Sequence, residues 1–451
     1  MFSMIKNKIF GIWKAVIDLK ISQVGIIVFL LVLIFGYLDF RIQGDGIYND
    51  GQSEFKALPK GMDFKAVHVY AVALRSGIDK YLAVGCNNYP PFVTIAYLPL
   101  SFFPADIAYQ FYCIILLLFL FALVYTLLSE KVNAIIQYKY KRTCKAILSL
   151  LIVYILFQTY PVNFAFERGN YDIIAVAFAA FALLAMSKRY MIASAGLLAI
   201  STQLKIYPAI LLVLLFARFG WKGILYFVVF NGLMLSLLGI PGFENFVFTV
   251  LKFSANPFLW AGNHSLVSFL SPFNGMVYLK SYISLNIFLL PFLGFFAVAV
   301  FRYFQLTKHY RKKNTKVLVK AHFNGMEIGI IGISFCLMAL VPSVSHDYKL
   351  VIQILPLILL FTRSRLDLIS SKNVALILTI VISASIAYLF IPRYMILPFR
   401  LIGLSSYVAE MKTPALLIAF FGYLYLALMG NSNVACDIES VENVKEFSDP
   451  K

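Results

Sequence analysis

Long apolar runs separated by short polar loops recur along nearly all of the 451 residues. A transmembrane helix needs about 20 apolar residues, because each residue adds about 1.5 Å and the hydrocarbon core is about 30 Å thick. The runs, several of them short, predict about twelve spans. They lie near residues 22–40, 105–128, 146–160, 172–187, 190–204, 206–217, 223–240, 284–304, 324–342, 349–362, 374–392 and 414–430. The pattern predicts an all-α, polytopic membrane helical bundle, formed by one integral membrane domain over residues 1–430.

Two stretches are not simple spans. Residues 92–103 are too few to cross a bilayer and are bounded by prolines, which favours a re-entrant or interfacial helix. The apolar run 191–216 is interrupted at residues 205–208. Counting at about 1.5 Å per residue from the basic loop at Arg189, we expect Lys205 near the outer lipid headgroups.

The charges fix an expected orientation. Apolar residues make up 61% of the chain and charged residues 13%, with a formal net charge of +18. Segment 305–322 holds six Lys or Arg and no acid, whereas loop 39–91 holds six basic and six acidic residues. The positive-inside rule places the first in the cytoplasm and the second outside. This alternation argues against nucleic-acid binding. It predicts a multi-pass protein of the plasma membrane, the inner membrane of a bacterium, with both the N- and the C-terminus in the cytoplasm.

The two ends of the chain are expected to differ in structure. The apolar run near the N-terminus has no small-residue cleavage site after it, so we expect a retained span. The acidic tail, residues 431–451, is expected to be disordered and cytoplasmic. The five cysteines show no CxxC spacing, so neither a metal site nor a disulfide framework is implied. No cofactor is expected.

An ionisable group at membrane depth costs about 2.5 to 3.5 kcal/mol. Most of the ionisable residues here avoid this cost because they lie at the ends of the predicted spans, and a polar set collects at the outer ends. They come from six separate outer segments, which a helical bundle can bring to one cavity. The set is Asp63; Glu167, Arg168 and Asp172; Lys205; Asn263 and His264; His346 and Asp347; Arg393 and Arg400.

Several of these residues stand in ordered motifs. They are Asp63-Phe64 followed by Tyr70, Ala71, Leu74 and Gly77; Arg168-Gly169-Asn170-Tyr171-Asp172; the helix at 195–208 that ends in Lys205-Ile206-Tyr207-Pro208; Asn263-His264-Ser265; and His346-Asp347-Tyr348. The series resembles glycosyltransferase family 87. That resemblance implies the C-type glycosyltransferase architecture, with a helical first outer loop, and transfer of a sugar, typically mannose, from a polyprenyl-phosphate carrier. Two positions depart from the pattern, His264 where Gln is expected and Ser345 where an aromatic residue is common.

Asp63 has two interpretations. It precedes a helical run and so could act as an N-cap. With the resemblance, it is the candidate general base that takes the proton of an acceptor hydroxyl, an effect of about 10² to 10⁴ in rate.

The basic candidates also keep their alternatives. Lys205 either extends to the interface, as lysines near span ends do, or holds the donor phosphate. Arg168 either binds phosphate or pairs with Glu167 or Asp172. His346 is either a hydrogen-bonded structural residue or a phosphate donor.

Sugar and acceptor contacts are expected from a further set of polar residues. Tyrosines near the outer surface also suit an interfacial aromatic belt, so Tyr89 has both interpretations. The set is Tyr89, Asn170, Asp172, Asn263, His264 and Tyr348.

The sequence therefore predicts a membrane hexosyltransferase of the cell envelope. Its donor would be a polyprenyl-phosphate sugar and its acceptor a glycan or glycolipid hydroxyl on the outer face. A polytopic transporter or lipid-linked oligosaccharide flippase is the main alternative, although such proteins place ionisable groups near the midplane. An inactive scaffold subunit is the third possibility.

Overall fold

The computed structural model describes residues 60–78, 89–128, 141–157, 159–254, 265–266, 289–313, 323, 325–342, 345, 347–363, 381 and 412–429. Every regular element in these ranges is a helix, and they contain no strand. The predicted all-α class is therefore confirmed for the described part of the chain. The predicted spans near 22–40 and 374–392 and the tail 431–451 lie outside it, apart from Val381.

The helices follow one another along the chain, with 3₁₀ turns marked η. They are α3 (Met62–Arg75), α5 (Pro91–Tyr97), η1 (Leu98–Phe102), α6 (Ala105–Leu127), α8 (Lys141–Phe157), α9 (Tyr160–Arg168), α10 (Asp172–Ser187), α11 (Met191–Leu204), η3 (Tyr207–Leu211), α12 (Leu212–Phe219), α13 (Trp221–Leu235), η4 (Ser236–Leu238), α14 (Gly239–Ser254), α17 (Leu290–Lys313), α18 (Gly325–Leu340), η5 (Asp347–Gln353), α19 (Ile354–Arg363) and α21 (Lys412–Met429).

Some of these helices are long and apolar enough to cross a membrane. Within the described ranges, Ala105–Leu127 and Trp221–Val250 meet that test by length and composition, and a pair bent by 81°, Arg142–Phe157 with Pro161–Arg168, would be a third. The other apolar helices, among them α10, α11 and α18, have 10–17 residues. These apolar helices are those of a membrane protein, and the total of about twelve spans stays a prediction.

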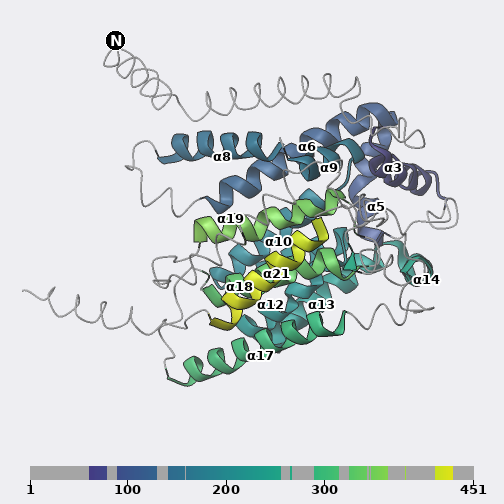
Figure 1. Cartoon of the computed structure of the whole chain (residues 1–451). Helices are drawn as coiled ribbons and strands as arrows, with labels where there is room; N and C mark the ends of the chain where they lie inside the picture. The colour runs from purple at the N-terminus through teal and green to yellow at the C-terminus, as the bar shows by residue number, and fades with distance from the viewer. Residues whose placement is uncertain are drawn as a thin grey trace, which may run out of the picture.

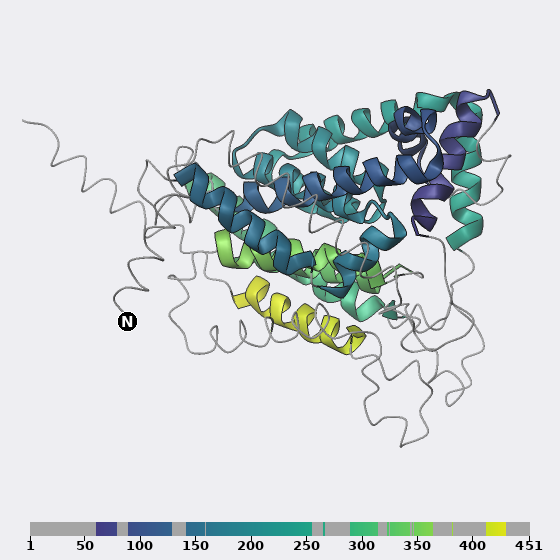
Figure 2. The same cartoon turned by 90° about the horizontal axis from the view of Figure 1, so that it is seen from above.

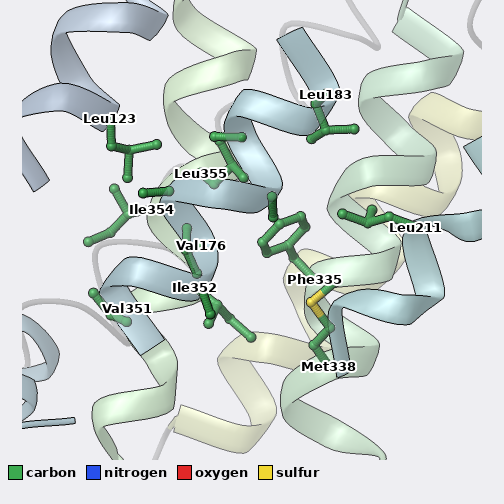
Figure 3. Packing of buried hydrophobic residues seen from close by; sticks show 14 of the residues in the cluster. Leu123, Val176, Leu183, Leu211, Phe335, Met338, Val351, Ile352, Ile354 and Leu355 are labelled. Carbon is green, nitrogen blue, oxygen red and sulfur yellow. The ribbon is translucent and has the colours of Figure 1, made fainter. Parts of the chain in front are cut away.

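Helix α10 forms the centre of the bundle. Almost every residue from Asp172 to Ser187 is buried, and a helix that is apolar all round belongs in an interior. It packs against α6 and α11, and the Ser201 hydroxyl of α11 donates to the Ala175 carbonyl at 2.7 Å. Figure 3 shows Val176 of α10 in the same cluster as Phe335 of α18 and Leu355 of α19.

Glycines allow α18 to approach α21 closely. A Cβ atom on Gly329 would lie 2.4 Å from the backbone nitrogen of Ala427, and one on Gly332 would lie 2.1 Å from the Tyr423 ring. Small residues permit such backbone approach between membrane helices. This contact joins the last described helix to the core.

The short helices α3 and α5 lie together at one end of the bundle, whose longer helices run side by side (Figures 1 and 2). The helix predicted at 92–103 is confirmed as α5 and η1, which continue each other over Pro91–Phe102. His68 and Arg75 of α3 bond carbonyl groups at the far end of η1, with Arg75 Nη1 donating to the Ser101 oxygen at 2.5 Å. The first described helix is thereby attached to the second.

A buried ion pair ties three helices together away from that end. Arg218 of α12 donates to Glu327 of α18 at 2.5 Å, and the Tyr303 hydroxyl of α17 donates to the same carboxylate oxygen at 2.7 Å. The guanidinium also lies 5.5 Å from the Phe323 ring centroid. The sequence analysis did not single out this cluster.

Candidate active site

Asp63 lies in the first turn of α3, which begins after Gly61 in the left-handed conformation (φ 74°). The N-cap position belongs to Gly61 and no side chain caps the helix, so the N-cap interpretation of Asp63 is wrong. The carboxylate instead reaches across to residues more than 100 positions later. Its place at a helix N-terminus is electrostatically favourable for a negative charge.

Both carboxylate oxygens of Asp63 are held from one turn of the chain. Arg168 Nη2 donates to Oδ1 at 2.6 Å, and Asn170 Nδ2 donates to Oδ2 at 2.8 Å. The side chains of Asp63 and Arg168 are 10% and 15% exposed. A carboxylate bonded at both oxygens has a fixed orientation, and charge-assisted bonds of this kind are among the strongest in proteins.

The turn that bonds the Asp63 carboxylate depends on Gly169. Helix α9 ends at Arg168, and Gly169 adopts φ 65°, a left-handed geometry that favours glycine. The amides of Gly169 and Asn170 bond back to the carbonyls of Phe166 and Ala165, which closes the helix end. A Cβ on Gly169 would lie 2.6 Å from the Cβ of Phe64, so the turn can touch α3 only without a side chain there.

Two further hydrogen bonds, one from the start of α3 and one from α6, reach the end of α9 beside this turn. The Gly61 amide donates to the Glu167 carbonyl at 2.7 Å, and the Tyr109 hydroxyl of α6 donates to the Phe166 carbonyl at 2.7 Å. The Phe64 ring is buried, with ring centroids of Tyr97 and Tyr112 at 5.5 and 5.0 Å. Contacts to the backbone of α3 and to the side chain of Asp63 therefore hold the candidate base in place.

Asn170 extends the network to the start of α10. Its side-chain oxygen accepts the Asp172 amide at 3.0 Å, while its nitrogen holds Asp63. The Asp172 carboxylate is fully buried, accepts a hydrogen bond from the Tyr207 hydroxyl and lies 3.9 Å from the Lys205 ammonium. Residues from α3, the α9–α10 turn and the break after α11 thus form one connected polar cluster.

Lys205 occupies the predicted interruption, which the structure confirms. Helix α11 ends at Leu204, Lys205 is extended (φ −146°, ψ 132°), and η3 begins at Tyr207. The ammonium lies 4.7 Å from the Tyr171 ring centroid and 5.3 Å from that of Tyr89, and its side chain is 13% exposed. Aromatic faces attract a cation at this range, so the ammonium is held inward.

Tyr89 lies just before α5 and faces this cluster. Its ring meets Tyr171 edge-on, with centroids 4.9 Å apart. Burial raises the pKa of its hydroxyl, and the nearby Lys205 acts in the opposite direction. With its pKa above the ordinary value, the phenol is neutral at physiological pH and can donate a hydrogen bond.

The structure adds Lys349, which the sequence analysis passed over as the start of a span. Its side chain is buried at 8% exposure, and its ammonium lies 5.4 Å from the Tyr207 ring centroid. Its position three residues after His346, in the last motif, was the signal available in the sequence.

The predicted site residues therefore divide into two groups. Asp63, Arg168, Asn170, Asp172, Lys205 and Tyr89 come together. Asn263, His264 and His346 lie outside the described residues, as do the side chains of Asp347 and Tyr348. The predicted partners of Arg168, Glu167 or Asp172, are replaced in its salt bridge by Asp63. Among the described residues, no three His, Cys, Asp or Glu side chains gather as a metal site.

Comparison with known proteins supplies the class. No curated protein matches the chain. Residues 87–325, more than half of its length, match glycosyltransferase family 87. The matched region contains the turn at 168–172 and Lys205, while Asp63 precedes it and Lys349 follows it. A glycosyltransferase moves a sugar from a donor to an acceptor, and the apolar helices are those of a membrane protein. The chain belongs to glycosyltransferase family 87.

Proposed function

We propose that this protein transfers a hexose, with mannose the first candidate, from a polyprenyl-phosphate carrier to an acceptor hydroxyl. The observation that supports this is the connected cluster of Asp63, Arg168, Asn170, Asp172 and Lys205 at one end of an apolar bundle. It combines an oriented carboxylate with an inward-facing ammonium. Those are the two groups that a base-assisted displacement of a phosphate needs.

In the proposed reaction Asp63 accepts the proton of the acceptor hydroxyl while the acceptor oxygen attacks the anomeric carbon. The bond from that carbon to the phosphate oxygen breaks, and its electron pair leaves with the polyprenyl phosphate. Lys205 stabilises the negative charge that develops on the phosphate. The family resemblance implies inversion at the anomeric carbon.

Arg168 has a more specific role in this proposal than the one expected from its motif alone. Its guanidinium contacts the Asp63 carboxylate and lies 3.8 Å from the Met62 sulfur. These contacts support a positioning role for Arg168, which would hold the Asp63 carboxylate in the orientation that faces the acceptor. Phosphate contact by Arg168 and His346, and sugar or acceptor contact by Tyr89, Asn170, Asp172, Asn263, His264 and Tyr348, stay predictions.

The orientation of the protein in the membrane is part of the same proposal. The end of the bundle that carries α3 would face the outside of the plasma membrane, with both chain termini in the cytoplasm. The acceptor would then be a glycan or glycolipid of the cell envelope. The family match gives no support to the transporter and flippase alternative.

A donor panel tests the proposal. The purified full chain, in detergent with a mixed glycan acceptor, would receive labelled mannose or glucose on polyprenyl phosphate, or the same sugars on a nucleotide. We expect label transfer from a polyprenyl-phosphate sugar alone. Transfer from the nucleotide sugars alone would overturn the donor assignment.

A further inference from the structure

A second buried ammonium lies beside the candidate site. We propose that Lys349 is a donor-binding residue that holds the carrier phosphate together with Lys205. This inference rests on the proposed function and adds a residue that lies beyond the family match, which ends at residue 325.

Tyr207 connects the two lysines. Its hydroxyl donates to Asp172, whose other oxygen lies 3.9 Å from the Lys205 ammonium. The Lys349 ammonium lies over its ring, 5.4 Å from the ring centroid. Tyr207 therefore contacts the Lys349 ammonium through its ring and the carboxylate beside Lys205 through its hydroxyl.

The helices around Lys349 place it beside the candidate site. Turn η5 packs against α9 and α10, the helices that end in Arg168 and begin with Asp172. The Gln353 side chain of η5 donates to the Phe335 carbonyl of α18 at 2.7 Å, which fixes the turn in the core. Lys349 thus lies on a turn that packs into the bundle and not on a surface loop.

The charges of the cluster suit an anion. Arg168, Lys205 and Lys349 are basic and Asp63 and Asp172 are acidic, so the basic side chains outnumber the acidic ones among these five. A polyprenyl-phosphate sugar is a phosphodiester with one negative charge, and an anion beside Lys349 would favour the charged ammonium over the neutral amine.

The charge on the phosphate also differs between the donor and the product. When the sugar leaves, the phosphodiester becomes a phosphate monoester whose charge approaches −2, because its second pKa is about 6. The added charge develops on the phosphate in the transition state. Two ammonium groups facing that phosphate would stabilise it more than one does, which assigns Lys349 to both donor binding and the chemical step.

The test measures binding as well as turnover. Full-length protein, Lys349→Met, Lys349→Arg and the control Lys222→Met would each be titrated with a short-chain polyprenyl phosphate and with the matching polyprenol. Lys222 is exposed in the first turn of α13, so its substitution changes the same residue type outside the site. Thermal melting of each variant checks folding, and transfer rates give the donor KM and kcat.

We expect Lys349→Met to weaken polyprenyl phosphate binding and raise the donor KM by about 10- to 100-fold, the effect of losing a charge-assisted bond. Polyprenol binding should not change, and Lys349→Arg should restore most of the phosphate affinity. Equal losses for both lipids, or unchanged phosphate affinity in a folded Lys349→Met protein, would overturn the role of Lys349 and leave the proposed function standing. Failure of the unaltered protein to bind polyprenyl phosphate would remove the proposed function and this inference together.

Discussion

Arg168 and Asp63 are 105 residues apart in the sequence, and their side chains meet at 2.6 Å with little exposure to solvent. The guanidinium and the Asn170 amide come from one turn, with the left-handed Gly169 between them, so two residues of this turn hold a single carboxylate. Precise orientation of a base matters more to catalysis than to folding. The pair therefore gives the most specific predictions.

Substitution of Arg168 should separate positioning from binding. We expect Arg168→Lys to lower kcat by about 10- to 100-fold, because lysine keeps the charge but loses the planar fork that fixes Asp63. The donor KM should change less than about threefold, because Arg168 contacts Asp63 and not the donor in this proposal. Steady-state transfer assays measure both constants. A large rise in donor KM with unchanged kcat would instead make Arg168 a phosphate ligand.

Gly169→Ala tests the close approach of the turn to α3. The left-handed backbone costs a residue with a Cβ about 1 to 2 kcal/mol. The new Cβ would also meet Phe64 at 2.6 Å, so α3 has to move away. We expect loss of transfer in a protein that melts at a lower temperature. Gly77→Ala is the matched control, since Gly77 is also left-handed (φ 75°) and has no neighbour within 4 Å; it should carry the strain without the loss of activity.

Lys205→Met should impair the leaving-group step. The ammonium lies between Asp172 and two aromatic rings, and methionine fills the space without the charge. We expect kcat/KM for the donor to fall by about 10² to 10³, the usual cost of losing one group that stabilises a developing anion. Lys65→Met, which removes the partner of Asp106 at the surface of α6, provides the comparison and should leave transfer near its original rate. Similar losses in both variants would show that the effect is a general one of charge.

The buried pair of Arg218 and Glu327 gives a prediction about stability. Glu327→Gln leaves the guanidinium, with its side chain 16% exposed, without its carboxylate, which costs about 3 to 5 kcal/mol for buried pairs. We expect a lower melting temperature, with kcat little changed at temperatures where the variant is folded. The double substitution Arg218→Met with Glu327→Met should regain much of the lost stability. A double variant that melts below Glu327→Gln would contradict this account.

Local patterns predicted most of the elements. The apolar runs at 105–128, 172–187 and 324–342 correspond to α6, α10 and α18, because burial and lipid exposure both select apolar residues at these lengths. The break at Lys205 was also visible, since a Pro two residues into the next element prevents a continuous helix. Convergence of the polar residues was expected because they lie at the same predicted ends of the spans, which a helical bundle can bring to one cavity.

Side-chain partners were not predictable in the same way. Arg168 was assigned to acids near it in sequence, whereas the left-handed Gly169 turns the chain so that the guanidinium meets a distant helix. Lys349 was absorbed into an apolar run, because nothing local shows that η5 packs against α9 and α10. Such contacts depend on tertiary packing and not on the spacing of residues.

The role of Asp63 as the base is tested most directly by the transfer rate of Asp63→Asn with saturating polyprenyl-phosphate sugar. Asparagine has the same shape but cannot accept the acceptor proton. Asp106→Asn, the same change at a carboxylate that is 82% exposed, is the control. We predict a fall in kcat of about 10² to 10⁴ for Asp63→Asn, with polyprenyl phosphate binding retained, and no such fall for Asp106→Asn. A folded Asp63→Asn protein that transfers sugar at the original rate would contradict the account.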